Sequence, residues 1–324
     1  MLSIRARSSG LTAADVQRAL VVERSLVRTW SLRGALQLIT AEDAGWLLAL
    51  VAPGLTASGA DSARHVELGL DEGTFVRAEA AIVEALARRG PLTREELVEH
   101  LGAGGIDASG QRAALLLQRA ALRAGICHGP SRSAKPTYVL LCDWAGPRRA
   151  CERPAALAAI TRRYLAACGP AEPADLATWS GLSIRDARAG WSLVAGELAE
   201  VTAAGRRAWM LAEDRDGSGA SLQPHRPAVR LLPAFDPYLL GYRDRTLAVR
   251  SEHAKRVNAG GGMVRPTVAV DGLVVGAWRH TQADRRPEAT IEPFEVLSTE
   301  ALTGLTEEAA DVSRFLGSGT EGLA

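Results

Sequence analysis

The octapeptide Gly90-Pro91-Leu92-Thr93-Arg94-Glu95-Glu96-Leu97 lies at the centre of the fold prediction for this chain of 324 residues. Its glycine and proline end a helix predicted over residues 75–89, where apolar residues recur at helical spacing. Thr93 then begins a second helix as its N-cap, and Glu96, three residues later, completes a capping box. The octapeptide therefore predicts two helices joined by a tight turn.

The same order of signals occurs again downstream. The first copy continues with a helix over 109–124 and two strand-like stretches, 125–128 and 138–141. The second copy has a helix over 157–167, a helix from Pro173, a helix over 183–198, and strands over 198–202 and 208–211. Three helices followed by a β-hairpin are typical of a winged helix-turn-helix. Two copies in one chain therefore predict tandem winged helix-turn-helix units.

The first 70 residues resemble part of a third such unit. Thr12 caps a helix, a second segment covers 23–32, and a strand covers 35–39. The unit lacks an opening helix in this interpretation. We therefore expect it to expose apolar side chains that such a helix would cover, namely Val16, Leu20, Leu47 and Leu50.

Strand-like sequence dominates after Pro227. Residues 267–278 alternate around Asp271-Gly272, a pair preferred in type I′ hairpin turns. Further strands are predicted over 229–233 and 289–294, and a helix over 299–315. The predicted fold class is α+β, with tandem winged helix-turn-helix units followed by a small β-rich C-terminal module. The predicted ranges are 1–70 for the incomplete unit, 71–150 and 151–215 for winged-helix units, and 225–324 for the C-terminal module.

Composition excludes several classes of protein. Hydrophobic residues make up 47% of the chain, and no apolar run reaches the roughly 18 to 20 residues that span a bilayer. Because the N-terminus also lacks a signal-peptide core, we expect a soluble, cytoplasmic protein without a membrane partner. The four cysteines form no C-x-x-C pair, which favours buried small residues over a metal site. The glycines at 260–262 precede no Lys-Ser/Thr pair and predict a turn, so no cofactor is expected.

The net charge of +1 conceals a basic block. Residues 109–142 carry no acid and five cations, which are Arg112, Arg119, Arg123, Arg132 and Lys135. Arg112 and Arg119 are seven residues apart, which puts them near one face of the third helix. Arg132 and Lys135 lie in the loop of the predicted wing. The block predicts contacts with DNA phosphates, and the alternative is an ordinary solvated helix face.

Two other segments leave the interpretation open. In the second copy, Arg185 and Arg188 stand close to Asp186, so DNA binding and a solvated face are equally supported. Residues 236–245 are rich in aromatic and charged residues. This segment either packs as a turn or offers Tyr238, Tyr242 and Arg243 to nucleic acid.

Two stretches resemble a known family. Residues 26–43 (LVRTWSLRGALQLITAED) and 231–245 (LLPAFDPYLLGYRDR) resemble the bacterial winged-helix proteins that include the AlkZ-like DNA glycosylases. The resemblance implies tandem winged helices that bind double-stranded DNA, with Arg33 of the first stretch among the DNA-binding candidates. It also implies hydrolysis of the N-glycosidic bond of alkylated purines, including crosslinks. We expect a monomer that binds duplex DNA, alkylated or not, without a small-molecule cofactor.

The sequence departs from the pattern of this family in the catalytic motif. The family's catalytic motif is Gln-apolar-Gln or Gln-apolar-Asp, upstream of the stretch that matches residues 11–40. We expect this motif to be absent, since Gln37 is followed by Leu38 and Ile39 and lies on a later strand. No catalytic residue is predicted. Two hypotheses remain: a DNA-binding relative of the alkylpurine glycosylases without the motif, or an active glycosylase, in DNA repair or genotoxin self-resistance, whose true N-terminus is longer.

Overall fold

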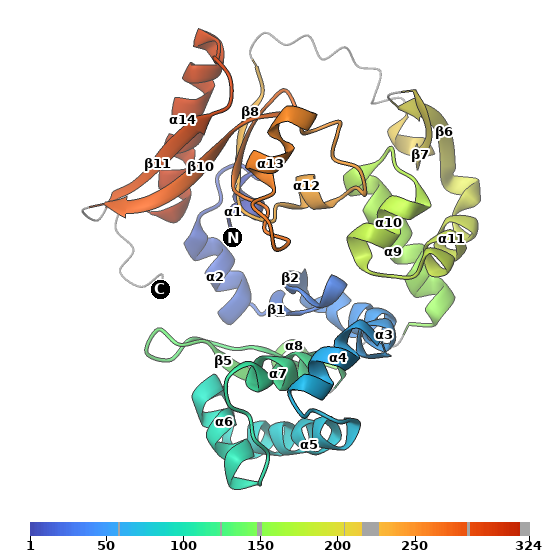
Figure 1. Ribbon diagram of the computed structural model, residues 1–324, viewed down its shortest axis with the longest axis vertical. Helices are drawn as coiled ribbons and strands as arrows, with labels where there is room; N and C mark the ends of the chain where they lie inside the picture. The colour runs from blue at the N-terminus through green and yellow to red at the C-terminus, as the bar shows by residue number, and fades with distance from the viewer. Residues whose placement is uncertain are drawn as a thin grey trace. The chain divides into compact units, whose positions relative to one another are not determined.

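A computed structural model describes residues 1–57, 59–123, 125–147, 151–203, 205–215, 227–283 and 286–317 (Figure 1). The chain divides into two compact units. Unit 1 comprises Met1–Val16, Arg162–Trp179 and the described residues from Val194 on, and unit 2 comprises Gln17–Thr161 and Ser180–Leu193. Both units combine segments that are distant in sequence, so the four predicted ranges stay a prediction.

Unit 2 contains a five-stranded sheet in the order β2-β1-β4-β5-β3. The segment over 23–32 that follows the first predicted helix is strand β1 (Leu26–Trp30), which pairs antiparallel with β2 (Leu36–Thr40). Burial alternates along β1, where Val27 and Thr29 are buried and Arg28 is exposed. Arg28 also pairs with His128 of β4, so the N-terminal hairpin extends the sheet of the first repeat copy.

The first repeat copy has the predicted order of elements. The elements are α5 (Glu72–Arg89), β3 (Leu92–Thr93), α6 (Arg94–Ala103), α7 (Gln111–Arg123), β4 (Ile126–His128) and β5 (Thr137–Leu140). The capping box is confirmed, because the Thr93 N–H donates to Glu96 Oε2 at 2.8 Å and the Glu96 N–H donates to Thr93 Oγ1 at 3.3 Å. The apolar faces of the three helices form one core with Ile126 and Tyr138 of the sheet.

The prediction of an exposed apolar face near the N-terminus is wrong. Helix α3 (Ala41–Ala57) packs against α7, and its residues Leu47 and Leu50 are 7% and 4% exposed. Val16, on α2 (Ala13–Val21), is 3% exposed, and Leu20 is half-buried. Helix α4 (Gly59–Glu67) follows α3.

Helices α9 (Arg153–Cys168) and α11 (Ile184–Leu193) contribute to unit 2, after the short helix α8 (Leu141–Ala145). They approach closely at Gly190, where a Cβ would lie 2.3 Å from Thr161 Oγ1 and 3.1 Å from the Leu157 carbonyl oxygen. Glycine is the residue that permits this approach. Residue 190 therefore sets the spacing of the two helices.

Unit 1 contains a four-stranded antiparallel sheet in the order β11-β10-β9-β8. Its strands are β8 (Val229–Leu232), β9 (Thr267–Val270), β10 (Leu273–Ala283) and β11 (Arg286–Pro293), and α14 (Thr299–Leu316) packs on it (Figure 1). The Asp-Gly turn is confirmed, since Asp271 and Gly272 have φ of 49° and 82°. The predicted strands and the terminal helix of this module are thus present.

The rest of unit 1 is built from short elements. They are α1 (Leu2–Arg5), α10 (Pro173–Ser180), the hairpin β6 (Leu198–Ala203) and β7 (Arg206–Leu211), α12 (Pro237–Leu240) and α13 (Ala254–Val257). Buried Arg5 ties α1 to α14 through Glu308 at 3.0 Å and Asp311 at 3.1 Å, and it donates to the Leu231 carbonyl at 2.7 Å. The first helix is therefore held by the C-terminal module.

Candidate nucleic-acid interface

The cations of the predicted basic block are paired with acids from outside it. Arg112 pairs with Asp107, Arg132 with Glu96, and Lys135 with Glu95 at 3.7 Å. These acids lie on α6 or in the loop before α7. The sequence block carries no acid of its own, but the fold supplies one to each of these cations.

Arg119 is unsuited to the phosphate contact predicted for it. Its side chain is 7% exposed, pairs with Glu72 and, at 3.0 Å, with Glu79, and lies over the Phe75 ring. A guanidinium held in this way packs α7 against α5 instead of facing solvent. Removing it from its partners would leave buried charge uncompensated, so we assign it a structural role.

Arg132 and Lys135 remain available as DNA-binding candidates. Their side chains are 52% and 60% exposed, as are large parts of their acidic partners. Exposed ion pairs of this kind contribute about 0 to 1 kcal/mol, so exchanging a carboxylate for a phosphate costs little. The net gain in DNA affinity from Arg132 and Lys135 is correspondingly small, because each cation exchanges a carboxylate partner for a phosphate.

Helix α11 presents cations of a different kind. Arg185 and Arg188 are exposed, and their side chains make no ion pair or hydrogen bond within the described part of the chain. Their spacing of three residues puts them on one helix face. Asp186 forms its ion pair with Arg153 at 2.9 Å, and the nearby charge of Arg185 adds to the stabilisation of this carboxylate. Burial opposes ionisation of Asp186, but its hydrogen bonds with Ser183 and Arg153 keep the pKa of this carboxyl below its usual value.

Arg33 lies in a segment next to the start of α11. It has φ of 57° in a tight turn, and the Gly34 carbonyl of this turn accepts a hydrogen bond from Gln118 Nε2 at 2.7 Å. On the other side, a Cβ at Gly181 would lie 3.2 Å from the Arg33 Cα. The backbone of the turn is therefore fixed between α7 and the loop that leads into α11. We define the α11 surface as Arg33, Arg185 and Arg188.

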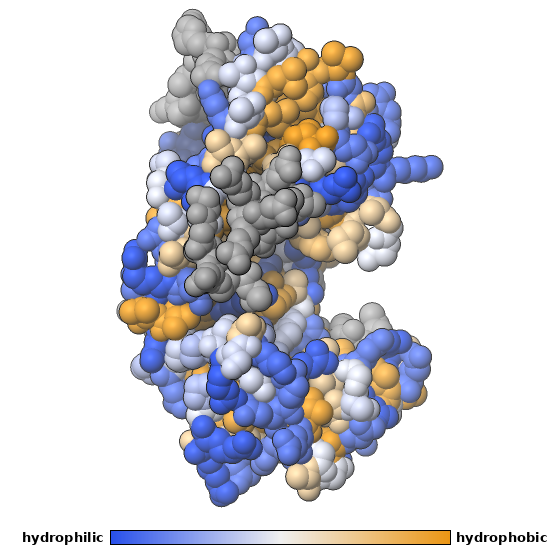
Figure 2. All heavy atoms as spheres, turned by 90° about the vertical axis from the view of Figure 1, so that its left-hand side faces the viewer, coloured by the Kyte–Doolittle hydropathy of each residue, from blue (hydrophilic) through white to orange (hydrophobic). Residues whose placement is uncertain are grey.

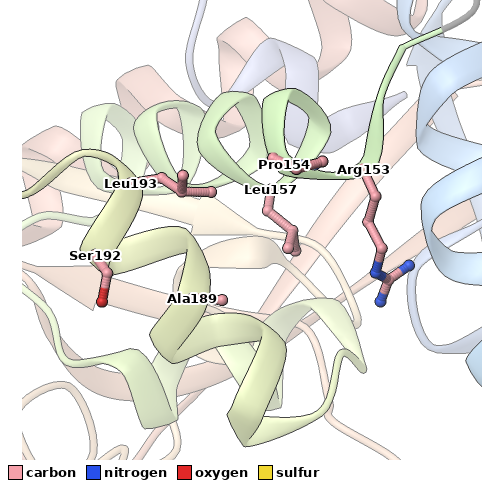
Figure 3. A pocket seen from close by; sticks show the side chains of 6 residues that line it. All are labelled: Arg153, Pro154, Leu157, Ala189, Ser192 and Leu193. Carbon is pink, nitrogen blue, oxygen red and sulfur yellow. The ribbon is translucent and has the colours of Figure 1, made fainter.

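A shallow apolar cavity of about 430 Å³ lies between α9 and α11 (Figure 3). It is lined by Arg153, Pro154, Leu157, Ala189, Ser192 and Leu193. Figure 3 shows Leu157 and Leu193 between the two helices, and the Arg153 guanidinium lies apart from these two leucines. This lining offers few polar groups to orient a reacting substrate.

The segment 236–245 packs through its tyrosines. The Tyr238 hydroxyl donates to the Gly272 carbonyl at 2.7 Å, and the Tyr242 hydroxyl donates to the Cys168 carbonyl at 2.5 Å. Burial raises the pKa of Tyr242 to about 12. Arg243 is exposed, and no partner for its side chain is found among the residues with described structure. Tyr238, although 37% exposed, uses its hydroxyl within the fold, so Arg243 is the residue of the three with its polar group free for a ligand.

Within the described ranges, no three His, Cys, Asp or Glu side chains are placed to hold a metal ion. Gln37 Oε1 accepts a hydrogen bond from Ser31 Oγ at 2.5 Å inside the β1–β2 hairpin. The prediction of four buried cysteines is wrong for Cys142, which is exposed, whereas Cys127 is buried.

The surface is mixed in character. Figure 2 shows mainly hydrophilic residues on the face that it presents, with apolar residues gathered in separate patches. In the portion of the chain that is described, no helix has both the length and the apolar character to cross a bilayer. The cytoplasmic location and the monomeric state stay predictions.

Comparisons with known proteins give a consistent result. The family model described as "DNA glycosylase AlkZ-like" matches residues 1–315. A Streptomyces sahachiroi protein described as "Interstrand DNA cross-link repair glycosylase" is 29% identical over 337 residues, which cover 98% of this chain and 85% of that protein. The solved structure of "Streptomyces sahachiroi DNA glycosylase AlkZ" has a TM-score of 0.81 and 28% identity, covering 99% of this chain and 86% of that one. The similarity extends over nearly the whole chain.

Proposed function

The chain belongs to the AlkZ-like DNA glycosylase family, and on that premise we propose that it is a DNA-repair protein that binds double-stranded DNA. The observation that carries this proposal is the extent of the match, which covers residues 1–315 in the family model and 99% of the chain in the solved relative. The resemblance carried by residues 26–43 and 231–245 is confirmed. Binding to DNA by this chain follows from the chemistry of its family.

We assign α7 and α11 the position of recognition helices in two winged-helix units. The order of elements supports this assignment, since α5, α6 and α7 precede β4 and β5, and α9, α10 and α11 precede β6 and β7. Of the two helices, α11 is the better candidate for phosphate contact. The side chains of its arginines make no ion pair or hydrogen bond in the described structure, whereas those of α7 are paired.

The α11 surface favours recognition of the DNA backbone over recognition of base sequence. Arg185 and Arg188, the exposed arginines of this surface, can replace the counterions that surround phosphates, and release of those counterions drives binding. Arg132, Lys135 and Arg243 are secondary contacts in this proposal. We therefore expect affinity to fall steeply with added salt and to depend little on base sequence.

A second candidate function is hydrolysis of the N-glycosidic bond of alkylated purines. The description of the relative from Streptomyces sahachiroi as a cross-link repair glycosylase favours it. Alkylation makes the purine a cationic leaving group, so the enzyme stabilises an oxocarbenium-like sugar and positions a water molecule. We assign no described residue to these two roles.

One assay separates the two functions. The chain is incubated with duplex DNA that carries N7-methylguanine, and the sample is divided between a native gel and an alkali-treated denaturing gel. A mobility shift without strand cleavage supports binding alone, and cleavage at the modified position supports glycosylase activity. Failure to shift any duplex at low salt contradicts the proposed DNA binding.

A further inference from the structure

Phe235 is an exposed aromatic residue with an unusual backbone conformation. All four phenylalanines of the chain lie in the described ranges, and Phe235, at 47%, is the exposed one. Its φ of 57° falls in the left-handed region, where a bulky side chain is an outlier. Strained residues of this kind persist where the surrounding structure imposes them, and they are concentrated at functional sites.

The residues on both sides hold Phe235 in this conformation. Asp236 is fully buried, accepts two hydrogen bonds from the Arg7 guanidinium at 2.6 and 3.0 Å, and caps α12 through the Tyr238 N–H at 2.9 Å. The Phe235 N–H donates to the Val264 carbonyl at 3.4 Å. The backbone is anchored, while the ring projects into solvent.

A second apolar side chain stands in the adjoining loop. Met263, next to Val264 in the chain, is 47% exposed. It closes the turn over the glycines at 260–262, whose φ angles are 89°, 56° and 79°, and its N–H donates to the Gly260 carbonyl at 2.9 Å. A Cβ on any of the three glycines would meet no atom within 4 Å, so this turn protrudes. Two fixed loops thus expose Phe235 and Met263.

Cations occur in the loop segment that carries Met263. Residues 254–266 contain three cations and no acid. Arg245 donates to Asn258 Oδ1 at 2.6 Å, and Asn258 bridges to Val264, so this guanidinium lies against the Met263 loop. Lys255 is exposed without an ion-pair partner among the described residues. Arg256 and Arg265 pair with Glu292 at 3.0 and 2.8 Å, whereas Lys255 and Arg245 have no acidic partner among the described residues. An apolar projection close in the fold to two such cations matches stacked bases, which present an apolar interior between phosphates.

We propose that Phe235, with Met263 beside it, is a wedge that enters the base stack of duplex DNA and fills the space beside a displaced base. The inference rests on the proposed DNA binding and adds the contact that distinguishes a damaged site from intact duplex. Apolar side chains that insert between base steps unstack them, and unstacking is cheapest where a base is damaged or missing. Phe235 acts as a positioning residue in this proposal.

The test compares two duplexes of the same sequence, one intact and one with a central abasic site. We expect the unaltered protein to bind the abasic duplex at least about fivefold more tightly, the order of one base-aromatic stacking contact. Phe235→Ala removes this preference and leaves affinity for the intact duplex within about twofold, since the phosphate contacts remain. A 2-aminopurine next to the abasic site reports insertion, because its fluorescence changes with the unaltered protein and not with the variant.

Two further variants keep the test informative. Val296→Ala removes another apolar side chain of unit 1, 99% exposed, and should leave the preference unchanged. Phe235→Gly relieves the backbone strain, so the unfolding midpoint should not fall while the preference is lost. The wedge proposal is overturned if Phe235→Ala and Val296→Ala show the same preference for the abasic duplex. It is also overturned if the unaltered protein binds the abasic and intact duplexes equally well. Absence of binding to both duplexes overturns the proposed DNA binding itself.

Discussion

Replacing Arg185 and Arg188 by glutamine is expected to reduce the salt dependence of duplex binding. Each phosphate that loses a cationic contact lowers the slope of log affinity against log salt by about 0.9, so the double variant loses about 1.8. Between about 50 and 200 mM salt, this difference amounts to about twelvefold in affinity. The full effect is expected because neither arginine has an ion pair or side-chain hydrogen bond to break within the described structure.

The matched control is Arg112→Gln with Arg132→Gln. It removes the same charge from the predicted basic block, but each of these arginines already faces a carboxylate, on Asp107 and Glu96. Forming a phosphate contact there requires breaking an ion pair, so the slope should change by less than half as much. Arg119 is left out of this control because its removal would destabilise the packing of α7.

Fluorescence anisotropy with a labelled duplex, titrated at several salt concentrations, measures both slopes. Thermal melts followed by circular dichroism establish that each variant folds. A double variant of α11 that keeps the slope of the unaltered protein refutes the reasoning. An equal reduction of the salt slope in the two double variants would show that ion pairing within the protein does not determine which cations contact phosphate.

Three further predictions concern stability, measured by urea unfolding. Arg5→Met should cost about 3 kcal/mol, because it leaves the carboxylate of Glu308, 13% exposed, without its main counterion; an unchanged midpoint would contradict this. Gly190→Ala should cost about 1 to 3 kcal/mol by overpacking, and Thr161→Ala should restore part of it, whereas a neutral effect would mean that the helices move apart freely. Burial, with nearby Arg28, lowers the pKa of His128 to about 4, so the folded state holds the ring neutral while the unfolded chain takes up a proton near pH 6.5. Stability should therefore fall by about 3 kcal/mol more between pH 6.5 and 4 in the unaltered protein than in His128→Phe, and equal pH profiles would refute the assignment.

Local structure followed the sequence closely. The capping box at Thr93 and the hairpin turn at Asp271-Gly272 are present as predicted. The helices and strands of both repeat copies occur in the predicted order, but the helix predicted over 183–198 ends at Leu193. The segment over 23–32 became strand β1, because its β-branched and aromatic residues pair with β2 and extend a sheet begun elsewhere in the chain. The candidate site was predicted less well. Arg119 turned inward, and exposed Phe235 carried no signal beyond its place in the second resembling stretch.

The sequence by itself determined the caps, the turns, the order of elements and, through two resembling stretches, the family. These features depend on contacts between residues a few positions apart, which the chain specifies locally. Only the tertiary structure decided which cations face solvent. Arg119 meets Glu79 across 40 residues and Arg132 meets Glu96 across 36, whereas Arg185 and Arg188 form no ion pair in the described structure. Charge availability is a property of neighbours in space, and folding, not sequence order, chooses those neighbours.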